Sequence, residues 1–158
     1  MQTSDPKELI DLLQKKTLRI RTGIWLMPIS MLGKESDHAA RMNIDAVDVR
    51  DVLLENLPKD TRYLGLNANR VMQLVQEISD QFPGSECLLV YNLDLLLSKL
   101  AHTEISHVWQ HLYDSFPNRR HALIVSMPEN ATHLLPDFVS MKSWNKDKRL
   151  SSTRPKEI

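Results

Sequence analysis

The chain has 158 residues, of which 42% are hydrophobic and 25% are charged, and this is the composition of one ordinary globular domain. Lysine and arginine total 20, as do aspartate and glutamate, so the formal net charge is zero and a generally basic nucleic-acid-binding domain is not favoured. A single cysteine excludes a disulfide framework. No run reaches the roughly 18 apolar residues that a membrane span needs, and charges appear early in the chain. We therefore expect a cytoplasmic protein without a signal peptide or membrane partner.

The first elements are predicted by capping and by apolar runs. Asp5 is suited to cap a helix that has Pro6 at its first position. Residues 24–27 form a short, fully apolar run that ends at Pro28, which is typical of a buried central strand. A second strand is predicted at 44–49, followed by a helix.

The second half of the chain repeats this alternation. Asn67 can cap a helix whose apolar stripe runs to residue 82, and the strand predicted at 87–91 is the clearest in the chain. A further helix at 104–116 and a strand at 121–127 follow. Strands that are apolar on both faces and alternate with helices predict an α/β fold of three layers. We expect a mostly parallel sheet of about four or five strands with helices on both faces.

The sequence changes character near its C-terminal end. Residues 141–158 contain six lysines or arginines against two acidic residues, and few apolar residues follow Trp144. We therefore predict one α/β domain at 1–140 and a basic, flexible tail at 141–158. Basic residues beside an aromatic ring suit contact with a nucleic-acid backbone, although a solvated tail has the same composition. The candidate nucleic-acid-binding residues are Lys142, Lys146, Lys148, Arg149 and Arg154.

The segment after the first strand partly matches a phosphate-binding loop. Gly33 and Lys34 have the spacing of the second glycine and the lysine in the pattern G-x-x-x-x-G-K-[ST]. Pro28 stands in place of the first glycine, and Glu35 stands in place of the hydroxyl that would hold magnesium. Ser36 lies one position late. The segment is therefore either a degenerate phosphate loop or an exposed loop with a solvated lysine.

Two later strand ends supply the other candidate residues. P-loop NTPases hold magnesium with an aspartate at the end of the third strand, where this chain has Tyr91 and then Asn92. Neither side chain can replace an aspartate as metal ligand or a glutamate as general base. Asp94 follows two residues later, and Ser126 lies near the end of the fourth strand. The structural alternatives are that Asp94 caps the next segment and that Ser126 bonds to local backbone.

The histidines predict no metal site. His107 and His111 have the i, i+4 spacing of two ligands on one helix, but residue 108 is valine, so the pattern H-E-x-x-H is absent. We expect both histidines on a solvated helix face.

Together these segments resemble a reduced, AAA-like P-loop ATPase core over residues 20–137. Within that class the chain is most similar to the small P-loop protein, the F component, of BREX-type bacterial phage-defence systems. The third strand of that family ends in a pattern similar to D-N-I-E-I-L-F. Residues 91–97 match it in register, with Tyr91 for the first aspartate and Asp94 for the glutamate. The candidate nucleotide-binding residues are Gly33, Lys34, Ser36, Asn92, Asp94 and Ser126.

The resemblance implies a non-catalytic assembly protein of a phage-defence complex. Without the magnesium-binding residues we expect negligible hydrolysis and no cofactor, with ATP as the alternative ligand. The implied partners are larger proteins of the complex, DNA through the basic tail, and further copies of the chain. The alternative is a nucleotide-binding regulatory subunit, or an ATPase that a partner or neighbouring subunit completes.

Overall fold

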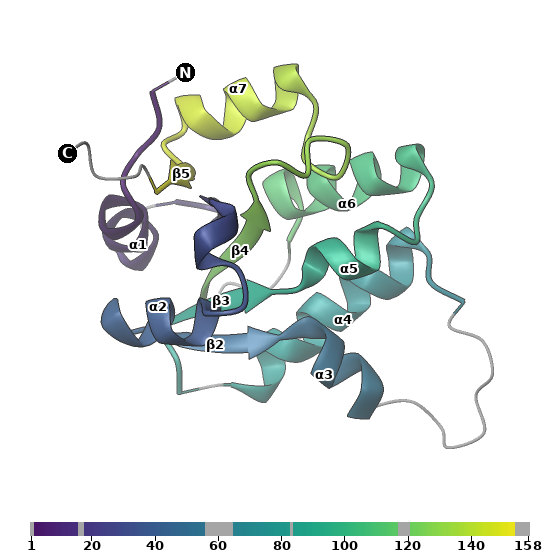
Figure 1. Ribbon diagram of the computed structural model, residues 1–158, viewed down its shortest axis with the longest axis horizontal. Coiled ribbons are helices and arrows are strands. Elements are labelled where there is room, and N and C mark those ends of the chain that lie inside the picture. Colours follow the sequence, from purple (N-terminus) through teal and green to yellow (C-terminus); the bar gives the residue numbers. More distant parts are fainter. Residues whose placement is uncertain (1, 16–17, 56–64, 83, 117–120, 154–158) are drawn as a thin grey trace.

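The domain is built on one parallel sheet, shown in Figure 1. The computed structural model describes residues 2–15, 18–55, 65–82, 84–116 and 121–153. Five strands lie in the order β2-β3-β4-β1-β5, and every paired strand is parallel to its neighbour. The strands are β1 (Thr22–Met27), β2 (Asp45–Asp48), β3 (Cys87–Tyr91), β4 (Ala122–Pro128) and β5 (Leu150–Ser152).

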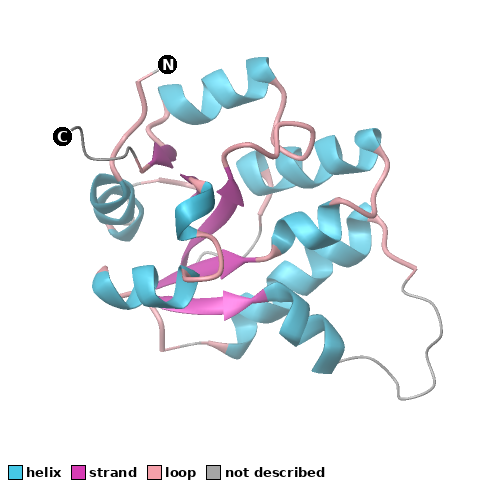
Figure 2. Cartoon of the chain, viewed as in Figure 1, coloured by secondary structure: helices cyan, strands magenta, loops and turns pink. Residues whose placement is uncertain are grey.

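Helices cover both faces of this sheet, as Figure 2 shows, and this confirms the predicted three-layer α/β fold. The helices α1 and α2 pack on one face, whereas the apolar residues of α3 to α7 form the larger core on the other face. Among the described residues, no helix combines the length and apolar character needed to cross a membrane. The helices are α1 (Pro6–Gln14), α2 (Glu35–Arg41), α3 (Val49–Glu55), α4 (Ala68–Gln81), α5 (Leu93–Leu97), α6 (His102–Asp114) and α7 (Phe138–Lys146).

Local sequence signals set the element boundaries. The carboxylate of Asp5 accepts hydrogen bonds from the first backbone amides of α1, and the side chain of Asn67 accepts one from the amide of Arg70 at 2.8 Å. Both predicted caps are confirmed. The strands β3 and β4 are buried along nearly their whole length, because helices cover both of their faces. Cys87, at the start of β3, is buried, and burial raises the pKa of its thiol to about 12.

The prediction of a flexible tail from residue 141 is wrong for residues 141–153. These residues complete α7 and form β5, the edge strand beside β1. Only 1% of Trp144 and 5% of Arg149 is exposed. The sequence misled because separate buried residues rather than an apolar stripe attach this segment to the domain, namely Trp144, Arg149 and Leu150. Residues 154–158 lie outside the described part of the chain.

The order of the strands shows where the connections between strands diverge. The chain leaves β1 through α2 toward β2, and it leaves the neighbouring strand β4 through α7 toward β5. The two connections therefore run in opposite directions and over opposite faces of the sheet. In parallel sheets, ligands bind at the carboxyl ends of strands near such a switch point. The candidate residues after β1 and β3 lie along this edge.

Candidate functional site

The Gly-Lys segment joins β1 to α2 at the carboxyl edge of the sheet. Residues 29–31 form one turn of 3₁₀ helix, and Gly33 follows with a φ of +84°, a conformation that favours glycine. Lys34 is exposed and immediately precedes the first residue of α2. The sequence therefore placed Gly33 and Lys34 correctly between a buried strand and a helix.

Three backbone amides of this segment donate to carbonyls within the segment itself. Pro28 has no N–H group, the amide of Met31 donates to the carbonyl of Pro28 at 2.9 Å, and that of Leu32 donates to Ile29 at 3.1 Å. The amide of Lys34 donates to the carbonyl of Met31 at 3.3 Å. A phosphate loop instead directs several amides at its ligand. The amides of Met31, Leu32 and Lys34 consequently form a closed turn.

Side chains from three elements meet at the end of β3. The hydroxyls of Ser36, in the first turn of α2, and Tyr91 lie 3.3 Å apart. Asn92 has a φ of +66°, and its amide nitrogen donates to a carboxylate oxygen of Asp48 at 2.9 Å. Asn92 thereby links the ends of β2 and β3. Tyr91, which the resemblance aligns with a metal-binding aspartate, is bonded to Ser36.

This edge also collects negative charge. Glu35 is only 6% exposed and lies near Asp94, in the first turn of α5. Burial raises the pKa of Asp94, and the negative charge of Glu35 raises it further, although backbone hydrogen bonds oppose the rise. With Asp48 bonded to Asn92, three carboxyl groups lie at this edge, together with the exposed cations Lys34 and Arg50.

The remaining predicted residues lie elsewhere. Ser126 is buried inside β4 opposite Trp25, two residues before the strand ends. Lys142 and Lys146 are exposed on α7, and Lys148 is exposed in the turn before β5. They belong to the opposite part of the sheet from β3.

Arg149 corrects the prediction of a nucleic-acid contact at that position. Its Nε donates to the carbonyl of Thr22 at 2.7 Å, and its Nη2 donates to the Thr22 hydroxyl at 2.6 Å and to the carbonyl of Tyr113 at 3.0 Å. The guanidinium also lies 4.6 Å from the ring centre of Tyr113 and 4.5 Å from that of Trp144. Burial lowers its pKa to about 10, so it stays charged at neutral pH. A phosphate cannot reach it. Arg154 lies outside the described residues.

Sequence reasoning missed Asp48 and the burial of Glu35. Asp48 was visible as the last polar residue of the predicted strand at 44–49, and parallel strands place their carboxyl ends at one edge. The sequence carried no signal for the burial of Glu35, because the residue stands at the start of a helix that packs against β2 and β3.

The two histidines on α6 differ in exposure. His107 is exposed as predicted, whereas His111 is partly buried and its Nε2 has no hydrogen-bond partner. Burial lowers the pKa of His111, and the neighbouring His107 lowers it further. Within the described ranges, no three His, Cys, Asp or Glu side chains converge as metal ligands.

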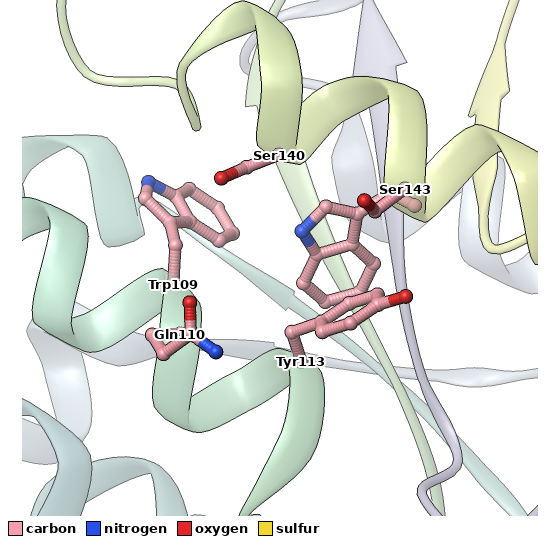
Figure 3. A pocket seen from close by; sticks show the side chains of 6 residues that line it. Trp109, Gln110, Tyr113, Ser140 and Ser143 are labelled. Atoms are coloured by element: carbon pink, nitrogen blue, oxygen red, sulfur yellow. The ribbon is translucent and has the colours of Figure 1, made fainter.

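A hollow lies between α6 and α7. Its volume is about 160 Å³, and Figure 3 shows Trp109 and Tyr113 on α6 facing Ser140 and Ser143 on α7. The indole of Trp109 lies edge-on to that of Trp144 at 6.4 Å, and its N–H donates to the carbonyl of Leu134 at 2.8 Å. This hollow marks the seam that joins α7 to the domain.

Comparison with protein-family models and with curated protein sequences found no match to this chain.

Proposed function

We propose that this protein is a non-catalytic assembly protein built on a reduced, P-loop-like core, and that it serves a prokaryotic phage-defence complex of BREX type. The observation that carries the non-catalytic part is the closed turn after β1. Its amides at Met31, Leu32 and Lys34 donate to carbonyls inside the turn. Phosphoryl transfer needs such amides, together with a metal, around the phosphates.

The surroundings of the turn support the same proposal. Tyr91 and Ser36 contact one another where a metal-binding carboxylate and hydroxyl would be needed. Glu35 and Asp94 bring negative charge to the place of a negatively charged ligand. The proposal of a BREX-type complex depends on the resemblance of residues 91–97 and on the Gly33-Lys34 segment. The partners proposed are therefore larger proteins of that complex.

The alternative function is a regulatory subunit that binds a nucleotide without turnover, or an ATPase that a partner completes. The exposure of Lys34 at the start of α2 favours it, because this lysine could reach a phosphate if the turn opened. With the turn open, the candidate contacts to the nucleotide are the residues that the resemblance implies, namely Gly33, Lys34, Ser36, Asn92, Asp94 and Ser126.

Thermal unfolding with excess ATP and magnesium distinguishes the two. A ligand at about 100 times its Kd stabilises the folded state by roughly 2.7 kcal/mol, which gives a clear shift in Tm for a domain of this size. The assembly protein is expected to show no shift in the parent, in Lys34→Ala or in the control Lys7→Ala, whose side chain is exposed on α1. A shift in the parent and the control that Lys34→Ala abolishes would replace the proposal with the regulatory function.

Co-expression tests the proposed partner class. The chain is produced with each protein encoded beside its gene, and complexes are isolated and measured by light scattering. A stable complex with a neighbouring methyltransferase or helicase of a defence cluster is the expected result. A gene far from any such cluster would remove the support for the BREX assignment while leaving the closed turn unaffected.

A further inference from the structure

The carboxyl group of Glu35 has no partner in the described part of the chain. Glu35 is only 6% exposed and begins α2, which packs against β2 and β3. Among the described residues, the one ion pair joins Arg70 and Glu77 on α4, and no hydrogen bond reaches the Glu35 carboxylate. A charge that burial removes from water is costly unless a group of opposite charge pairs with it. The fold therefore leaves one buried carboxylate unpaired.

Asp94 adds a second negative charge beside Glu35. It stands in the first turn of α5, which follows β3, and it is partly buried. Burial raises the pKa of Asp94 and the charge of Glu35 raises it further, so each carboxyl group disfavours the ionised form of the other. A cation held between the two groups would relieve this repulsion and would also pair the buried charge of Glu35.

The cations that the chain itself has at this edge do not fill that position. Lys34 and Arg50 are both exposed. Within the described ranges, neither of them forms an ion pair with Glu35 or Asp94. The cation that suits the two carboxyl groups is therefore one supplied by another molecule.

The donor set of the edge favours a guanidinium over a metal ion. Magnesium and calcium take six or more oxygen ligands. In the described chain, no three His, Cys, Asp or Glu side chains come together to supply them. A guanidinium needs fewer groups, because its planar fork donates hydrogen bonds to two carboxylates directly and is less strongly hydrated than an ammonium.

Exposed apolar side chains stand next to both carboxyl groups in the sequence. Leu95 directly follows Asp94 and is 40% exposed, and Ile29 lies in the turn that leads to Glu35 and is 68% exposed. Each follows the carboxyl end of a strand, β3 for Leu95 and β1 for Ile29. Exposed apolar residues around a charged group are typical of a surface that contacts a protein rather than a free ion.

We propose that the carboxyl edge receives an arginine side chain of a partner protein, whose guanidinium bonds to Glu35 and Asp94 while apolar residues next to that arginine contact Leu95 and Ile29. The inference rests on the proposed assembly function and deepens it, because it names the chemistry by which the partner is held. The contact needs no nucleotide, since the arginine pairs with carboxylates of this chain.

Titration of the isotopically labelled full chain with N-acetyl-arginine methylamide, followed by NMR, tests the proposal. Saturable shifts are expected at the backbone amides of residues 35–37 and 93–95, with a dissociation constant on the order of 10 mM, because one charged contact is weak by itself. Added salt should weaken the binding. The matched uncharged probe, N-acetyl-glutamine methylamide, should produce no saturable shift.

Variants of the edge assign the binding to its carboxyl groups. Glu35→Gln and Asp94→Asn keep the size of each side chain and remove its charge, so each should weaken binding of the arginine probe about tenfold or more. Asp37→Asn, an exposed acid on the same helix as Glu35, is the matched control and should bind as the parent does. Lys34→Ala should bind at least as tightly as the parent, because Lys34 does not occupy the site. Thermal unfolding checks that each variant keeps its fold.

Three results overturn the proposal, namely a parent without saturable shifts up to about 100 mM probe, an equal response to the glutamine probe, and full binding by Glu35→Gln. Magnesium that binds alone at the same amides and displaces the arginine probe also overturns it, and assigns the edge to a metal. The thermal shift with ATP tests the proposed function separately. A chain that responds neither to ATP nor to the arginine probe keeps the assembly function and loses this contact, whereas a shift with ATP that depends on Lys34 removes the assembly function itself.

Discussion

At the carboxyl edge, Lys34 is exposed, its amide completes a local turn, and the nearby charges of Glu35 and Asp94 repel one another. At the corner formed by α6, α7 and β5, Arg149 is buried, its donors reach carbonyls and a hydroxyl of two other elements, and two aromatic rings cover it. We name these regions the edge and the corner. The edge contains Lys34, which predicts a ligand, whereas the corner contains Arg149, whose hydrogen bonds stabilise the fold.

The comparison shows that the role of a basic residue depends on which groups accept its hydrogen bonds. A guanidinium can be buried where backbone carbonyls accept its hydrogen bonds, because an unpaired buried charge would be far more costly. A lysine beside a glycine suggests a phosphate site only if neighbouring amides are free to join it. The corner and the edge should therefore respond to mutation very differently.

The largest effect is expected at Arg149. Replacement by methionine keeps apolar volume but leaves the carbonyls of Thr22 and Tyr113 without this donor, and we expect a loss of about 3 kcal/mol in the free energy of unfolding. Arg149→Lys should fall between this variant and the parent, because it keeps the charge but not the planar fork. Urea denaturation followed by circular dichroism measures both.

The control for this prediction is Lys146→Ala, an exposed cation on the adjoining helix, which should stay within about 0.5 kcal/mol of the parent. If Arg149→Met were as stable as this control, the corner would not anchor the C-terminal segment.

The next effect concerns the close approach of β1 to its neighbours at the corner. A Cβ added at Gly23 would lie 2.9 Å from Cδ1 of Leu9 and 3.2 Å from the backbone oxygen of Arg149. The side chain can shift but the backbone oxygen is held in the sheet, so Gly23→Ala should destabilise the domain by about 1–3 kcal/mol. Gly84→Ala is the matched control, since no atom lies within 4 Å of its added Cβ. Equal thermal stability of the two variants would contradict the prediction.

The sheet was predictable because its interior strands are continuous apolar runs, as at 87–91 and 121–127, and such runs predict burial without knowledge of the fold. The strand β5 was not predictable, because Leu150 is its only apolar residue, and Ser151, which pairs with Trp25 of β1, is buried although it is polar. A buried arginine cannot be distinguished in sequence from a solvated one. The Gly33-Lys34 position was likewise predictable, but the closed state of its amides depends on backbone conformation that spacing does not determine.

A smaller effect is expected at the edge, for Asn92. Asn92 has a positive φ, which costs most residues roughly 1–2 kcal/mol but which glycine adopts freely. The side chain of Asn92 also bonds to Asp48. The variant Asn92→Gly should therefore lose about 1 kcal/mol in the free energy of unfolding, because it loses only the hydrogen bond. Asn92→Ala should lose about 2 kcal/mol, because it adds the backbone penalty. Chemical denaturation in which Asn92→Gly is the less stable of the two would refute the conformational argument.

The subtlest effect is the dependence of stability on pH at Asp94. Its pKa is raised above the ordinary value of 3.8, mainly by burial and further by Glu35, so the folded protein holds this proton more tightly than the unfolded chain. Between 3.8 and the higher folded pKa, the folded state therefore binds more protons, and the contribution of Asp94 to stability falls as pH rises. Above that window the ionised carboxylate stays unfavourable.

Replacing Asp94 with asparagine removes this titration, and the informative quantity is the difference between variant and parent at each pH. Other carboxyl groups act in the opposite direction, since hydrogen bonds lower the pKa of Asp114 and Asp137, but they are common to both proteins and cancel. Urea midpoints measured from pH 3 to pH 7 should show Asp94→Asn gaining on the parent as pH rises, whereas the exposed control Asp11→Asn should not. A gain that is the same at every pH would mean that burial and Glu35 do not disfavour the ionised carboxylate of Asp94, and the proposal of a non-catalytic protein would then lose its electrostatic support.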